Sequence, residues 1–134
     1  MRLPICVFIF LQVLIPFAMA ETLPCGTQVP AGTISGTTWT AAGSPYCVEG
    51  DLQIAGLTIE PGVVVQFMGN YEFRVGGVLT AIGEENNSIL FTKADEATAW
   101  QGVFFDRCGP GSEMAHCIVE LSGNSGIRID EAGP

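Results

Sequence analysis

Basic residues are scarce in this chain. Its 134 residues contain 5 Lys and Arg, one His and 14 Asp and Glu, for a formal net charge of -9 at pH 7. Such a surface repels phosphate backbones and anionic membranes, which excludes nucleic acid as a partner. A zinc site needs close pairs of ligands and a Ser-His-acid triad needs a well-placed histidine, and the lone His116 supports neither. We therefore expect no metal centre and no catalytic triad.

Helix signals and tight-hairpin signals are also missing after residue 20. No segment repeats apolar residues at helical spacing, which excludes a helical fold. The dipeptides Asn-Gly and Asp-Gly, typical of two-residue hairpins, do not occur, which counts against an antiparallel sandwich. The chain has instead very short runs of alternating apolar and polar residues, broken by Gly or Pro-Gly. This pattern predicts short strands with one buried face.

The first 20 residues have the pattern of a secretory signal peptide. Arg2 supplies a positive charge, residues 5–17 are mostly apolar, and Ala18 to Ala20 form a small-residue cleavage site. The apolar run is short for a bilayer span and contains Gln12 and Pro16, so a transmembrane anchor is the weaker interpretation. We predict a secreted or surface protein whose mature chain has no transmembrane segment.

The cysteines suit an oxidising compartment. Cys6 leaves with the signal peptide, and Cys25, Cys47, Cys108 and Cys117 allow three pairings. We favour Cys25 with Cys47, because both lie in the Gly-rich N-terminal segment, where closing the loop stabilises the fold by about 3 kcal/mol. A disulfide between Cys108 and Cys117 is the weaker prediction, since alternation points Cys117 inward, where a free thiol packs well.

The stretch from Leu57 to Phe67, LTIEPGVVVQF, contains the clearest repeat. Two alternating apolar runs are separated by Pro-Gly, and looser versions occur on both sides. A chain that coils one short strand after another around a shared core repeats its inward residues in this way. The predicted inward residues of this coil are Leu57, Ile59, Val63, Val65 and Phe67.

Aligning the runs predicts which strands stack. Each strand is expected to pair in parallel with its equivalent one turn later, with Phe67 and Phe91 stacked inside. The residues from Leu52 match those from Phe73 at an offset of 21, and beyond them the register is ambiguous: Gly62 and Gly83 keep 21, whereas apolar alternation prefers an offset of 22. The second choice implies a one-residue insertion, which belongs in a turn. The matched residues are Leu52 with Phe73, Gln53 with Arg74, Ile54 with Val75, Leu57 with Leu79, Ile59 with Ala81, Val65 with Ile89 and Phe67 with Phe91.

A set of short motifs carries a family resemblance: Trp39-Thr40, Gly43 to Tyr46, Gly50-Asp51, Leu57 to Phe67, Gly77 to Ala81, Ile89 to Thr92 and Trp100 to Phe105. From about Ile34 onward the chain resembles secreted, largely bacterial, right-handed parallel β-helix proteins of the pectate-lyase-like superfamily. The resemblance implies an all-β, right-handed parallel β-helix, with a signal peptide at 1–20, an N-terminal cap at 21–50 and incomplete coils at 51–134. It also implies that Trp39 covers the N-terminal end and that further C-terminal modules are missing.

The outward positions carry the candidate chemistry. Gln53, Arg74, Phe104 and Arg128 fall at matched places on successive coils, where a ring with flanking donors is suited to contact a sugar chain lying across them. Lyases of this superfamily place calcium-binding acids beside an Arg or Lys on such a face. No acidic cluster converges here. We predict carbohydrate contact at these four residues and no catalytic residue.

Carboxylates offer a second chemistry. A glycosidase needs two of them on adjoining coils, and the candidates are Asp106, Asp130 and Glu131. Neighbouring residues of a strand point to opposite faces, which weakens a pair made of Asp130 and Glu131. The acidic pairs Glu84-Glu85 and Asp95-Glu96 leave weak calcium binding open, and no other cofactor is expected.

These observations predict a secreted or surface-associated β-helix scaffold that is noncatalytic and contacts glycans or other cell-envelope components. The alternative is the N-terminal part of a polysaccharide lyase or glycoside hydrolase whose catalytic coils lie beyond residue 134. A fold of this kind supports either, because its motifs specify the core and leave the chemistry to the outward positions.

Overall fold

The computed structural model describes residues 25–94, 97, 99–107, 111–123 and 126–130. Within them the chain is all-β, with one short 3₁₀ turn, η2 (Ala41–Gly43). The strands are β1 (Thr27–Val29), β2 (Gly32–Ile34), β3 (Thr37–Trp39), β4 (Tyr46–Val48), β5 (Leu52–Ile59), β6 (Val64–Phe67), β7 (Phe73–Ile82), β8 (Ile89–Lys93), β9 (Val103–Asp106), β10 (Glu113–Ala115), β11 (Cys117–Val119) and β12 (Ile127–Asp130).

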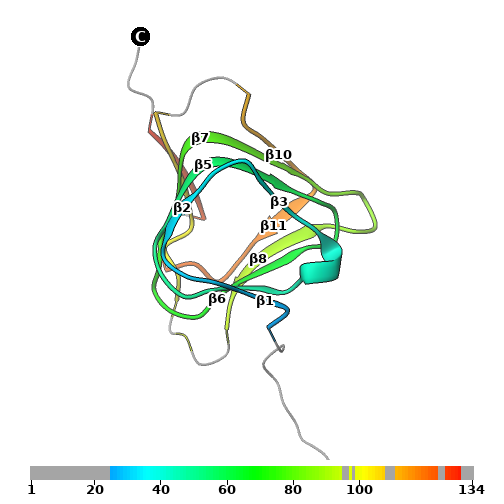
Figure 1. Ribbon diagram of the computed structural model, residues 1–134, viewed down its shortest axis with the longest axis horizontal. Coiled ribbons are helices and arrows are strands. Elements are labelled where there is room, and N and C mark those ends of the chain that lie inside the picture. The colour runs from blue at the N-terminus through cyan, green and yellow to red at the C-terminus, as the bar shows by residue number, and fades with distance from the viewer. Residues whose placement is uncertain (1–24, 95–96, 98, 108–110, 124–125, 131–134) are drawn as a thin grey trace, which may run out of the picture.

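The strands stack as a parallel β-helix of about four turns (Figure 1). One sheet has the order β1-β4-β6-β8-β11 and the other β12-β9-β7-β5-β2, and every pairing between these strands is parallel. β5 and β7 each line two sides of the coil. The pairing shows this, since β3 pairs with the C-terminal half of β5 and β10 with the C-terminal half of β7. The predicted all-β parallel β-helix is confirmed.

Alternation along β5 shows how the sequence builds this coil. Leu52, Ile54, Leu57 and Ile59 are each at most 3% exposed, while the residues between them face outward or the corner. Apolar side chains at every second position thus fill the interior, which is the main source of stability. The buried core consists of Val29, Trp39, Tyr46, Val48, Leu52, Ile54, Leu57, Ile59, Val63, Val65, Phe67, Phe73, Val75, Leu79, Ala81, Ile89, Phe91, Trp100, Val103 and Phe105.

The predicted insertion lies at the corner between β5 and β7. Leu52 pairs with Phe73 and Leu57 with Leu79, and the register shifts between Ile54 and Gly56. Gly77 permits this corner, because a Cβ there would lie 2.0 Å from the carbonyl oxygen of Ala55. A single extra residue therefore bends the strand without changing which side chains point inward.

Residues 27–48 follow the same register as the later coils. β1 pairs with β4, and β2 and β3 pair with β5, so the segment expected to form a cap supplies the first coil. Trp39 is 4% exposed and stacks on Tyr46 with ring centroids 4.7 Å apart. The Tyr46 hydroxyl accepts a hydrogen bond from the Thr40 backbone N–H at 2.9 Å. This aromatic pair fills the interior of the first coil.

The predicted register between β6 and β8 is wrong by two residues. Val65 pairs with Phe91 and Phe67 pairs with Lys93, rather than Val65 with Ile89 and Phe67 with Phe91. A shift of two preserves the inward and outward alternation, so the apolar pattern alone does not exclude it. Val65, Phe67, Ile89 and Phe91 are all fully buried in the observed register. Lys93, the new partner of Phe67, is half-buried.

The stacking partner of Phe67 comes from the connection between β8 and β9. Trp100 lies parallel to Phe67 with ring centroids 4.2 Å apart and is fully buried. Its indole N–H donates to the carbonyl oxygen of Glu120 at 2.8 Å. Phe73 meets Phe67 and Phe91 edge-on. The predicted Phe67–Phe91 stack is therefore replaced by a cluster of four rings centred between the coils.

The favoured disulfide is confirmed: Cys25 and Cys47 are joined, with Cα atoms 5.7 Å apart. Cys117 carries a free thiol that is half-buried and approaches the carbonyl oxygen of Ala81 at 3.2 Å. Burial raises the pKa of this thiol. Cys108, its weaker predicted partner, lies outside the described residues.

Other predictions also fall outside the described residues: the signal peptide at 1–20, the acidic pair Asp95-Glu96 and the carboxylate of Glu131. Within the part of the chain that the structure covers, no helix has the length and apolar character needed to cross a membrane.

Candidate functional site

The four outward residues predicted to contact carbohydrate occupy one continuous ladder. Gln53 pairs with Arg74, Arg74 with Phe104, and Phe104 with Arg128, each one coil from the next. Thr33 of β2 extends the ladder by pairing with Gln53. Parallel strands lie about 4.8 Å apart, so these five side chains form a row across the coils.

Phe104 is buried in this row, although it points outward. Its ring is 8% exposed, and guanidinium groups from both neighbouring strands lie over it, Arg74 at 4.6 Å and Arg128 at 3.9 Å from the centroid. Cation–π contact in a partly desolvated place holds the three side chains together. Little of the Phe104 side chain therefore faces solvent, and carbohydrate contact at this residue stays a prediction.

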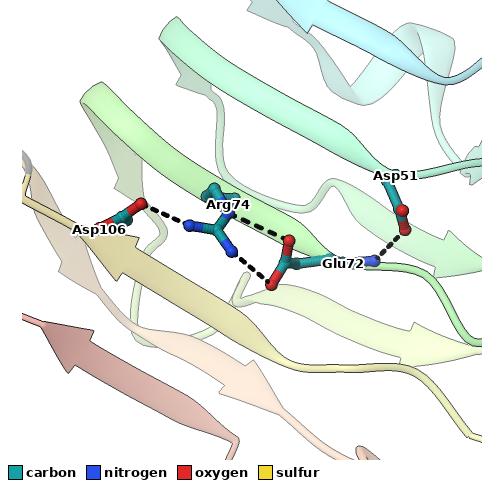
Figure 2. A network of polar contacts seen from close by, with 4 residues as sticks. All are labelled: Asp51, Glu72, Arg74 and Asp106. Carbon is teal, nitrogen blue, oxygen red and sulfur yellow. Dashed lines mark hydrogen bonds and ion pairs between the residues drawn. The ribbon is translucent and has the colours of Figure 1, made fainter.

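Arg74 is also bound by two carboxylates, as Figure 2 shows. Its Nε donates to Glu72 at 3.1 Å, and its Nη1 contacts Asp106 on the next coil. The backbone N–H of Glu72 in turn donates to Asp51 at 2.9 Å. Hydrogen bonds to Glu72 and Asp106 raise the pKa of Arg74. Arg74 thus links its own coil to the next one, and the backbone of Glu72 links the same coil to the preceding one, which is a structural role for the centre of the ladder.

A shallow groove adjoins the N-terminal half of the ladder. It has a volume of about 250 Å³ and is lined by Thr33, Gln53, Ile54, Ala55, Gly76 and Gly77. Thr33, Gln53 and Gly76 are exposed. No atom outside its immediate neighbours lies within 4 Å of where a Cβ of Gly76 would be, so the floor of the groove is open. Polar side chains at the rim and bare backbone below make this the part of the ladder that is free to receive a ligand.

Two of the carboxylates predicted for hydrolysis are neighbours in the register. Asp106 pairs with Asp130 on the adjoining coil, but Asp106 is the counter-ion of Arg74. Within the described ranges, no group of three or more His, Cys, Asp or Glu is placed to hold a metal ion. His116 is exposed in the turn between β10 and β11. The arrangement around Asp106 stabilises the coil, and calcium binding stays a prediction.

Sequence reasoning missed Thr33, Gly76 and Gly77 as groove residues and Glu72 as a partner of Arg74. Extending the alignment back by one coil, from Gln53 to Thr33, would have found the first of these. In the sequence the two glycines mark only a break in the apolar alternation, and the volume above them depends on how β5 and β7 bend. No pattern of apolar residues encodes that volume.

Comparison with known proteins gives no match: no protein-family model, no curated protein and no solved structure is significantly similar to the chain.

Proposed function

We propose that this chain is a noncatalytic scaffold of the cell exterior, built on a β-helix of the pectate-lyase-like kind, that contacts glycans through the groove beside Gln53. The disulfide between Cys25 and Cys47 supports an oxidising compartment. The acidic sequence argues against anionic polymers as ligands. A neutral glycan of the cell envelope suits this surface best.

The observation that carries the proposal is the groove. Thr33 and Gln53 lie side by side on adjacent coils and offer a hydroxyl and an amide, both able to donate and accept hydrogen bonds to sugar hydroxyls. Arg74 packs on Phe104 and forms ion pairs with Glu72 and Asp106, so these side chains stiffen one end of the groove. A rigid floor and few polar groups are typical of a preformed ligand site.

Binding of soluble neutral polysaccharides and oligosaccharides to the purified chain, followed by calorimetry, tests the proposal. Gln53→Ala should weaken binding at least about tenfold, because one lost hydrogen-bonding group leaves its partners unpaired. Gly76→Leu should abolish binding by filling the groove. Gln28→Ala on β1 is the matched control, an exposed glutamine on the other sheet, and should bind as the unchanged protein does.

Four results would contradict the proposal. Failure of every neutral glycan to bind, or binding by Gln53→Ala and Gly76→Leu as tight as that of the unchanged protein, would remove the glycan contact. Calcium-dependent release of unsaturated uronides, or release of reducing sugar, would overturn the noncatalytic role and favour the lyase or hydrolase alternative.

A further inference from the structure

The turn between β7 and β8 is longer than the turns at the same corner of the two neighbouring coils. Residues 83–88 connect these strands, whereas residues 60–63 connect β5 to β6 in the preceding coil and His116 alone connects β10 to β11 in the following one. The extra residues have no equivalent to stack on, and the turn projects from the side of the coil (Figure 1). A projecting turn is accessible to an enzyme that modifies the chain.

Backbone hydrogen bonds close this turn and leave its tip free. The N–H of Glu84 donates to the carbonyl oxygen of Asn87 at 3.1 Å, and the N–H of Asn87 donates to the carbonyl oxygen of Glu84 at 3.0 Å. The side chain of Asn87 lies against the preceding coil, because a Cβ on Gly62 would be 2.7 Å from its Oδ1. Glu85 and Asn86 form the tip, and both are exposed.

Asn86, Asn87 and Ser88 form the sequence Asn-Asn-Ser, and the chain contains no second Asn followed two positions later by Ser or Thr. Oligosaccharyltransferases attach glycans to Asn in this sequence when the middle residue is not Pro. Among the residues that the structure describes, none forms a hydrogen bond or ion pair with the side chain of Asn86 or Ser88. The amide and the hydroxyl that the enzyme must recognise are therefore both free.

We propose that Asn86 is the attachment site of an N-linked glycan. This attachment rests on the export that the proposed function includes, because the transferase acts in the exporting compartment. The donor is an oligosaccharide linked to a polyprenyl pyrophosphate. Nδ2 of Asn86 forms a bond to C1 of the first sugar, the bond from C1 to the pyrophosphate oxygen breaks, and the proton lost from Nδ2 passes to a base of the transferase.

The glycan is attached away from the groove beside Gln53. Gly76 lines that groove from the N-terminal half of β7, whereas Asn86 follows the C-terminal end of this strand. Loss of the glycan should therefore leave the affinity of the groove for neutral glycans unchanged.

Secretion of the full chain from cultured eukaryotic cells tests the proposal. Protein collected from the medium should lose mass when treated with the amidase that releases N-linked glycans, and peptide mass spectrometry should then find Asn86 converted to an aspartate. Asn86→Gln and Ser88→Ala should each abolish the loss of mass, and Ser88→Thr should keep it.

Asn70→Gln is the matched control, since Asn70 is an exposed asparagine of another turn without Ser or Thr two positions later. This variant should carry the glycan as the unchanged protein does. The amount of each variant in the medium checks that it folds and is exported.

Secreted protein without a glycan on Asn86 would overturn the attachment and leave the proposed function in place. A chain that stays inside the cells without a glycan would overturn both. A glycan that persists in Asn86→Gln would place the modification elsewhere and would also overturn the attachment.

Discussion

An inner coil and the last described coil of this β-helix follow the same pattern and differ in what covers them. Leu52-Gln53-Ile54 of β5 and Ile127-Arg128-Ile129 of β12 occupy equivalent places in one ladder of strands. Leu52 and Ile54 are each 1% exposed, whereas Ile127 and Ile129 are 46% and 65% exposed. An alternating apolar strand is therefore stable through its neighbours and gains little from its own sequence.

The N-terminal end achieves cover by other means. Trp39 lies in the first coil, stacks on Tyr46 and is 4% exposed, and the Cys25–Cys47 disulfide ties the start of this coil to β4. One large aromatic pair and one covalent bond take the place of a preceding coil. The last described coil has exposed isoleucines instead.

The largest loss of stability is expected in the first coil, whose interior is filled by the Trp39 ring. Trp39→Ala should lower the free energy of unfolding by about 3–5 kcal/mol, because it leaves a cavity under the first coil. Ile129→Ala should lower it by less than about 1 kcal/mol, since the side chain is 65% exposed. Urea unfolding at low protein concentration measures both. Equal losses would show that the two ends are covered alike.

Removal of the disulfide sharpens the same comparison. Cys25→Ala with Cys47→Ala should lower the free energy of unfolding by about 3 kcal/mol, because the bond restricts the unfolded chain. Cys117→Ala is the control in the last coil, where the half-buried thiol makes no disulfide. Unfolding with and without reductant checks the result: reductant should destabilise the unchanged protein and the Cys117→Ala variant only. Equal sensitivity of the double variant to reductant would contradict this role.

In the ladder of outward residues, the loss of stability on mutation should differ less between the centre, Arg74, and the end, Arg128. Arg74→Met should cost about 1 kcal/mol, because it breaks two partly exposed ion pairs and leaves Glu72 and Asp106 together. Arg128→Met should cost a few tenths of a kcal/mol, roughly half of one exposed cation–π contact. Thermal unfolding of both variants measures the difference. A larger loss at Arg128 would place the anchor of the ladder in the last coil.

The smallest effect concerns pH. Burial raises the pKa of the Cys117 thiol above its ordinary value of 9.0. The folded state then keeps the thiol proton at pH values where the unfolded chain releases it. The contribution of Cys117 to the free energy of unfolding is therefore fully present below pH 9.0 and is lost as the pH rises through the folded pKa. Cys117→Val has no such group. Its stability relative to the unchanged protein should increase between pH 8 and pH 10 in urea unfolding. A constant difference would contradict a raised pKa.

The sequence predicted the parts of the fold that depend on alternation. The inward residues from Leu57 to Phe67, the parallel pairing of Leu52 with Phe73 and the one-residue shift before Leu79 all follow from a period of two and from glycine corners. The pairing of Phe67 did not follow. Alternation leaves shifts of two residues open, and the partner ring of Trp100 comes from a connection without a periodic pattern.

The candidate site was predicted as a row of positions and not as a surface. Register placed Gln53, Arg74, Phe104 and Arg128 together correctly. Burial of the Phe104 ring depends on how long side chains from adjacent coils fold over it, and strand periodicity carries no information on this. The groove beside Gln53 depends on the bend of two strands, which is equally absent from the pattern.

Hydrogen exchange of backbone amides tests most directly whether cover by neighbours sets the stability of each strand. The measurement is made on the unchanged protein at low concentration. The account predicts that amides of β4 and β5 exchange only through global unfolding, and that those of β12 exchange many times faster through local opening. Equal protection of β5 and β12 would contradict the account.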